Sequence, residues 1–118
     1  MKLAIEVSRF AKGLRSGFLI FPQNGVDLLA LDEYLAAMDG VGKEDTWFLL
    51  NERRSPGEVQ HDLELLRLAR SRGKLVLVVD YPTDPDKVRE FFDKALAEGF
   101  VPYVGPLDLD RVGYFKPP

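Results

Sequence analysis

The chain has 118 residues, 46% of them hydrophobic and 30% charged, and this composition predicts one globular domain over residues 1–118. The formal net charge is −3 without a long basic run, which excludes the electrostatic pattern of a nucleic-acid binder. No apolar stretch reaches the roughly 18 residues of a membrane span, and Glu6 and Arg9 interrupt the start where a signal peptide is apolar. We therefore expect no nucleic-acid or membrane partner, and a cytoplasmic location as written, or an extracellular one if the chain is a fragment.

The first elements form a strand followed by a helix. The stretch "GFLIFPQNG", which starts at Gly17, is a short buried-strand pattern closed by Pro22 and Gly25. The stretch "VDLLALDEYLAAM" after it carries apolar residues at helical spacing, among them Leu28 and Leu35.

Two further helices have clear start and stop signals. "SPGEVQHDLELLRLARSRG" begins with a capping box at Ser55 and ends at Gly73, which suits a left-handed stop. The helix around "DKVREFFDKALAE" can be capped by Asp84 or Thr83 and should stop at Gly99.

The remaining strands flank this last helix. "LVLVV", Leu75 to Val79, is apolar without alternation, as expected for a parallel strand covered on both faces, and "FVPYVG" predicts a last short strand. Strands that alternate with helices through short loops indicate βαβ units with right-handed crossovers. The predicted class is therefore α/β with a parallel sheet.

Several polar residues follow the predicted strands. Functional groups of parallel α/β folds lie at the carboxyl ends of strands. The residues at or just past such ends are Gln23, Asn24, Asp80, Tyr81 and Tyr103. Asp80 alone is also explained by a turn or a helix cap. The sequence lacks a phosphate-binding glycine loop, a zinc-protease motif and a serine elbow, so carboxylates are the remaining acid-base chemistry, and we expect no metal or other cofactor.

Four segments carry a resemblance to a known family. "FPQNG", "DGVGKED", "LVLVVDYPTDPDKV" and "AEGFVPYVGPLDLDRV", in this order, resemble the carboxyl-terminal half of the endo-alpha-1,4-polygalactosaminidase family (glycoside hydrolase family 114) and its TIM-barrel relatives once labelled cysteinyl-tRNA-synthetase-related. The resemblance implies a (β/α)8 barrel that hydrolyses alpha-linked galactosamine polymers with a carboxylate pair and no metal. It assigns strands five to eight to Gly17–Pro22, Met38–Gly42, Lys74–Tyr81 and Phe100–Val104.

The position of Glu44 depends on which segment forms the second strand. Strand propensity favours "TWFLL", Thr46 to Leu50, which would put Glu44 at the amino end of that strand. The resemblance selects "MDGVG" instead, which places Glu44 beyond a carboxyl end as the counterpart of the family's acid/base glutamate. We favour the second alternative because it leaves a short loop after the preceding helix.

The length predicts half of a barrel. A full (β/α)8 barrel needs roughly 250 residues, so four (βα) units fit here. The resemblance places the second catalytic carboxylate in the absent half, and one glutamate cannot act both as nucleophile and as acid/base. We therefore expect a glycoside hydrolase-like chain that is inactive alone, with Glu44 as candidate acid/base and Gln23, Asn24, Asp80 and Tyr81 as sugar-binding residues.

Half a barrel would leave two strand edges and an apolar face uncovered. We expect a polysaccharide or sugar ligand together with either a homo-oligomer, such as two copies that close one barrel, or a missing N-terminal half-barrel. If the chain is a stable monomer, the tail "YFKPP" is the expected cover for an edge. The alternative function is a non-catalytic carbohydrate-binding or assembly module.

Overall fold

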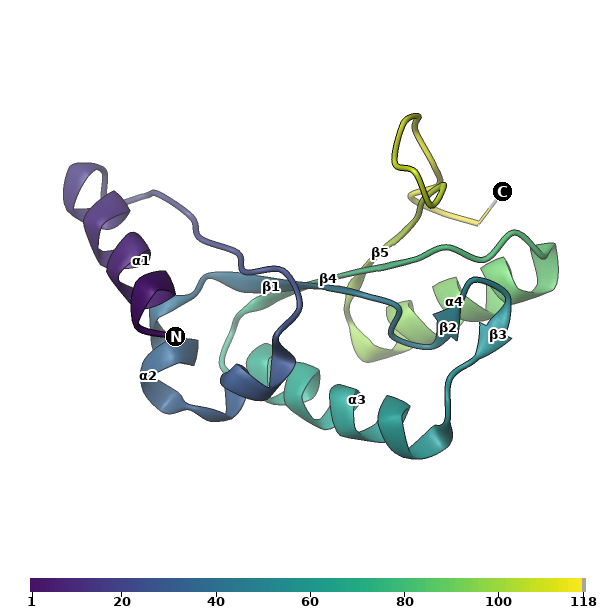
Figure 1. Cartoon of the computed structure of the whole chain (residues 1–118), viewed down its shortest axis with the longest axis horizontal. Coiled ribbons are helices and arrows are strands. Elements are labelled where there is room, and N and C mark those ends of the chain that lie inside the picture. The colour runs from purple at the N-terminus through teal and green to yellow at the C-terminus, as the bar shows by residue number, and fades with distance from the viewer. Residues whose placement is uncertain (118) are drawn as a thin grey trace.

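The computed structural model describes residues 1–117 and confirms the α/β class (Figure 1). Its elements in chain order are α1 (Lys2–Leu14), the 3-10 helix η1 (Val26–Ala30), α2 (Asp32–Ala37), β1 (Gly40–Glu44), β2 (Phe48–Leu49), β3 (Glu52–Arg53), α3 (Pro56–Ser71), β4 (Leu75–Asp80), α4 (Pro85–Glu98) and β5 (Val101–Val104). The main sheet has the order β1-β4-β5 with all strands parallel, and β2 and β3 form a separate antiparallel hairpin.

The predicted strand at Gly17–Pro22 is an extended segment and not a regular strand. It lies beside β1, because Gln23 and Gly42 form a parallel bridge and the Gly42 amide donates to the Pro22 carbonyl at 2.9 Å. Pro22 has no amide of its own to donate, which interrupts a regular ladder at this position. The sheet thus has three regular strands, with this segment in the fourth place.

The two long helices begin as their sequence signals predict. The Ser55 hydroxyl accepts from the Glu58 amide at 3.4 Å before α3. The carboxylate of Asp84, and not the side chain of Thr83, caps α4 by accepting from an amide of its first turn. Gly99 ends α4 in the left-handed conformation with φ of 76°.

The amino-terminal part differs from the sequence prediction. The single helix expected over "VDLLALDEYLAAM" is divided into η1 and α2, because Leu31 between them is extended. Helix α1 was not predicted. It packs against α2, where the Ser8 hydroxyl donates to the Ala37 carbonyl at 2.5 Å, and its Lys12 binds the Asp39 carboxylate at 2.5 Å.

The hydrophobic core lies between the sheet and helices α2, α3 and α4, which Figure 1 shows on one side of the β1–β4 ribbon. Helices α3 and α4 and strand β4 supply much of the core, with six buried residues: Leu63, Leu66, Val76, Val78, Phe91 and Phe92. Trp47, from the loop before β2, packs edge-on against Phe91 with 5.6 Å between ring centroids.

The other face of the sheet is open, which corrects the expectation that β4 is covered on both faces. Val76 and Val78 are buried, whereas Leu75 and Leu77, which point the opposite way, are 52% and 38% exposed. Val101 of β5 is 48% exposed beside them. An unbroken apolar run does not reveal whether this chain or another covers the second face.

Residues 106–117, here called the C-terminal strap, fold back on the edge of β5. Tyr114 and Val104 exchange two backbone hydrogen bonds of 2.8 and 2.9 Å, and the Gly113 amide donates to the Tyr103 hydroxyl at 2.6 Å. A Cβ on Gly113 would lie 2.0 Å from the Val104 carbonyl oxygen, so this close approach requires glycine. Within residues 1–117, no helix has the length and hydrophobicity needed to cross a bilayer.

Candidate functional site

Glu44 is the last residue of β1 and therefore lies at the carboxyl-terminal rim of the parallel sheet. It is in register with Val79 of β4. Of the competing segment "TWFLL", only Phe48 and Leu49 form a strand, in the β2–β3 hairpin beyond this rim. The strand lies two residues later than the predicted Met38–Gly42, so Glu44 is its last residue and not beyond it. The predicted place of Glu44 at the carboxyl end of a parallel strand is confirmed.

Two side chains hold the Glu44 carboxylate. The Asn24 amide donates to Oε2 at 3.1 Å, and the Tyr81 hydroxyl donates to Oε1 at 3.0 Å. The side-chain oxygen of Asn24, Oδ1, in turn accepts from the Glu44 backbone amide at 3.1 Å. Burial, together with the hydrogen bond to Glu44, raises the pKa of Tyr81 to about 12, so its hydroxyl remains a donor at neutral pH. Asn24, Glu44 and Tyr81 come from three neighbouring chain segments and form one cluster.

A shallow pocket of about 500 Å³ opens beside this cluster. Its walls combine both signs of charge with one apolar side chain. The lining residues are Asn24, Lys43, Glu44, Asp45, Leu49, Arg54 and Glu58. Such a polar depression at the rim of the sheet is suited to a hydrophilic ligand that presents hydroxyl or amino groups.

Asp80 has a different position from the one predicted. Its carboxylate is fully buried and accepts the backbone amides of Thr46, Trp47 and Phe48 at 2.8, 3.0 and 3.0 Å. Both oxygens are therefore used inside the protein, and the expectation of direct sugar contact by Asp80 is corrected. Burial raises the pKa of Asp80 to about 6, against the opposing effect of the three amides. Asp80 positions the turn that follows Glu44.

The same turn is held from its other side by Arg54 and Lys43. Arg54 Nη1 donates to the carbonyls of Asp45 and Thr46 at 2.8 and 3.0 Å and binds Asp62 at 2.7 Å. Lys43 Nζ donates to the Glu44 carbonyl and lies 3.7 Å from the Asp62 carboxylate. The backbone after Glu44 is thus fixed on its amide side by Asp80 and on its carbonyl side by two cations.

Asp45 is a site residue that the sequence analysis missed. It follows Glu44 directly, lines the same pocket and has a left-handed backbone with φ of 55°. Burial, together with the neighbouring Glu44 charge, raises the pKa of Asp45. The adjacent acids in "KED" were the available signal. Asn24 also has a left-handed backbone conformation, with φ of 60°. Two residues next to Glu44, Asn24 and Asp45, thus have this unfavourable conformation.

The other predicted sugar-binding residues are distributed differently. Tyr81, predicted as a sugar-binding residue, is buried and contacts Glu44 through its hydroxyl, and it does not line the pocket. Gln23 is exposed and lies over Gly42 on the open sheet face, where it borders an apolar hollow of about 230 Å³ with Tyr103. Phe115 of the strap packs against Tyr103 there, with 5.1 Å between ring centroids and the rings tilted by 48°.

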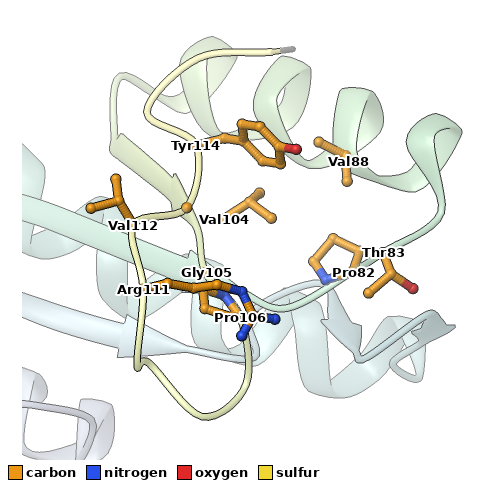
Figure 2. A pocket seen from close by; sticks show the side chains of 10 residues that line it. Pro82, Thr83, Val88, Val104, Gly105, Pro106, Arg111, Val112 and Tyr114 are labelled. Carbon is orange, nitrogen blue, oxygen red and sulfur yellow. The ribbon is translucent and has the colours of Figure 1, made fainter.

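A second rim pocket, of about 330 Å³, lies under the strap (Figure 2). Figure 2 shows Arg111 and Tyr114 of the strap on one side, with Pro82 and Thr83 after β4 and Val88 of α4 on the other. It contains no carboxylate in its lining, whereas the pocket beside Glu44 contains three, those of Glu44, Asp45 and Glu58. In the described residues 1–117, no cluster of three or more histidine, aspartate or glutamate side chains could hold a metal ion.

The fold is similar to part of a larger α/β domain of known structure. The glycoside hydrolase domain of PelA from Pseudomonas aeruginosa superposes with a TM-score of 0.72 at 19% sequence identity, over 94% of this chain and 46% of that domain. This likeness concerns the fold, because the identity is low.

Sequence relatives occur among uncharacterized proteins. This chain is 34% identical to one from Methanocaldococcus jannaschii over 93% of its length, 32% identical to one from Deinococcus radiodurans over 91%, and 25% identical to one from Thermotoga maritima over 93%. It spans only 35%, 35% and 37% of those proteins, respectively. No family model matches the chain.

Proposed function

We propose that this chain is one half of a polygalactosaminidase-type glycoside hydrolase, in which Glu44 is the general acid/base. The observation that carries the proposal is the Glu44 carboxylate, held between Asn24 and Tyr81 at the open carboxyl-terminal rim of the sheet. The fold shared with a glycoside hydrolase domain supports the reaction class. The alpha-1,4-linked galactosamine substrate follows from the resemblance in the four sequence segments.

The proposed chemistry follows the two-carboxylate pattern of retaining glycosidases. In its acid form Glu44 protonates the leaving glycosidic oxygen, while a second carboxylate attacks the anomeric carbon and forms a glycosyl-enzyme bond. Glu44 then removes a proton from the water that hydrolyses this bond, which regenerates both groups. In such enzymes the two carboxyl groups lie about 5 to 5.5 Å apart. The second carboxylate belongs to the complementary half-barrel.

Asn24 and Tyr81 are positioning residues in this proposal. Each donates one hydrogen bond to a different oxygen of Glu44, so together they fix the plane of the carboxylate. Asp80 fixes the backbone beyond Glu44 through the turn amides. Gln23, exposed on the open face near the same rim, remains the candidate for direct contact with a sugar hydroxyl.

A hydrolysis assay tests the proposal. The purified chain is incubated with deacetylated alpha-1,4-galactosamine polymer, alone and after recombination with the part of the M. jannaschii relative that lies outside the matched region. We expect new reducing ends only from the recombined sample, because the proposed nucleophilic carboxylate belongs to the complementary half-barrel. Turnover by the chain alone would contradict the proposed division of the site, and an inactive recombined complex would contradict the proposed reaction.

The alternative, a non-catalytic carbohydrate-binding module, is favoured by one observation. Tyr103 and Phe115 form an aromatic pair on the open face, and exposed aromatic surfaces of this kind stack on sugar rings. A Phe115→Ala variant that loses polymer binding, in a chain that binds without any hydrolysis in either sample, would support this alternative over the enzyme.

A further inference from the structure

Helix α1 carries an apolar stripe that no other part of the described chain covers. Leu3, Val7, Phe10 and Leu14 follow the spacing of one helix face and are between 48% and 75% exposed. The opposite face of α1, with Ile5, Ser8 and Ala11, already packs against the protein. A helix with two apolar faces is typical of an interior position in a layer of helices.

The extended segment next to α1 has a free backbone edge. Its bonds to β1 and Asp39 use the backbone groups of Ile20, Pro22 and Asn24. The alternate residues Leu19 and Phe21 point their amides and carbonyls away from β1, and within residues 1–117 these groups have no backbone partner. In a parallel barrel this is the side on which the preceding strand pairs.

The open face of the sheet continues this surface. Leu75, Leu77 and Val101 are exposed there, and Leu19 of the extended segment adds a large apolar side chain that is 62% exposed. In a closed barrel these positions of the sheet face the packed interior. The α1 stripe, the free edge and the open face are thus the three surfaces that an adjoining half of a barrel would bury.

We propose that these three surfaces form one docking interface for a complementary (β/α) half-barrel, which pairs its last strand with Leu19 and Phe21 and packs its last helix on the α1 stripe. The occupant follows from length. This chain matches only 46% of the PelA domain and about a third of its sequence relatives, so those proteins contain at least as much additional chain. The inference rests on the half-barrel architecture that the proposed function assumes, and it does not depend on whether the complex hydrolyses a sugar polymer.

A second copy fits the interface less well than a complementary half. Two identical copies that close a barrel must pair the β5 edge of each copy with the free edge of the other, at both seams. The strap already occupies that β5 edge, because Tyr114 is bonded to Val104. A complementary half has one unobstructed seam, at Leu19 and Phe21, whereas two copies have none, and closing the seam at β5 requires displacement of the strap in either case.

Sedimentation velocity tests the interface independently of activity. The chain is mixed with the unmatched part of the M. jannaschii relative, and the matched segment of that relative serves as positive control. We expect the unmatched part to form a 1:1 complex with this chain and with the matched segment. We expect Leu77→Glu in this chain to weaken the complex between this chain and the unmatched part at least tenfold. Leu50→Glu is the matched control, because Leu50 is comparably exposed, at 50%, but lies in the β2–β3 turn away from the interface.

Three results would overturn the inference. The first is failure of this chain to bind while the positive control binds, and the second is equal weakening by Leu77→Glu and Leu50→Glu. The third is a dimer of this chain alone that Leu77→Glu dissociates, which would assign the surface to a second copy. A 1:1 complex without hydrolysis would retain the interface and refute only the proposed reaction.

Discussion

Replacement of Glu44 by Gln in the recombined barrel should lower the rate of polymer hydrolysis by a factor of about 10² to 10⁴, the usual contribution of a general acid/base. Gln keeps the length of the side chain, and its amide can still form hydrogen bonds with Asn24 and Tyr81. The variant should therefore fold and assemble as the wild type does, and lose only the transferable proton. The measurement is the initial rate of reducing-end formation at saturating polymer.

The control for this substitution is Glu58→Gln. Glu58 lines the same pocket but is mostly exposed, and its carboxylate contacts Arg54 at 3.4 Å. It should retain the wild-type rate within about twofold, because an exposed ion pair contributes little. A Glu44→Gln variant that assembles normally and hydrolyses polymer within a few-fold of wild type would assign the acid/base role to another residue, with Asp45 as the first to examine.

Replacement of Asp80 by Asn should destabilise the chain more at pH 4 than at pH 7. The new amide nitrogen would replace one carboxylate oxygen, either the one that accepts from Trp47 and Phe48 or the one that accepts from Thr46. Because this nitrogen cannot accept, buried backbone donors would lose their partners, at a cost of roughly 2 to 5 kcal/mol at pH 4. The pH dependence comes from the wild type. Its Asp80 has a pKa of about 6 when folded, above the 3.8 of an unperturbed aspartate, so the folded chain holds this proton more tightly.

The sign follows from that difference. A raised pKa contributes stability below the unfolded value of 3.8, and this contribution is lost as the pH rises through about 6. Between pH 4 and pH 7 the loss amounts to about 2 kcal/mol, because the unfolded carboxyl is already partly protonated at pH 4, and the Asn variant does not have it. The deficit of the variant should thus shrink by that amount between pH 4 and pH 7, as measured by urea unfolding. Asp93→Asn, an exposed acid on α4, should show a deficit below about 0.5 kcal/mol at both pH values.

A constant deficit for Asp80→Asn across this range would contradict the buried, proton-binding carboxylate. A stability equal to that of the wild type at pH 4 would contradict its hydrogen bonds to the turn. Either result would also weaken the view that Asp80 positions Glu44.

Local signals explain which parts of the fold were predictable. The caps at Ser55 and Asp84 and the stop at Gly99 lie within a few residues of the elements that they bound, so a short window of sequence reveals them. The rim position of Glu44 was predicted against the strand propensity of "TWFLL" by loop length and resemblance. That stretch is aromatic because Trp47 and Phe48 pack into the core, and not because it forms a long strand.

The remaining features depend on contacts between distant residues. Asp80 accepts amides more than thirty positions away, so nothing near it in sequence separates a buried acceptor from a ligand-binding acid. The exposure of Leu77 was hidden for a similar reason, because an apolar run looks the same whether its cover lies in this chain or in another. The helical pattern also did not reveal the extended backbone at Leu31, which divides η1 from α2.

An NMR titration tests most directly whether the Glu44 rim is the sugar site. Only this chain is labelled with ¹⁵N, it is recombined with the unlabelled complementary half, and deacetylated alpha-1,4-galactosamine oligomer is added. The account predicts the largest shift changes at the side-chain amide of Asn24 and the backbone amides of Glu44 and Asp45. Shift changes confined to the strap pocket, at Thr83, Val88 and Tyr114, would contradict it.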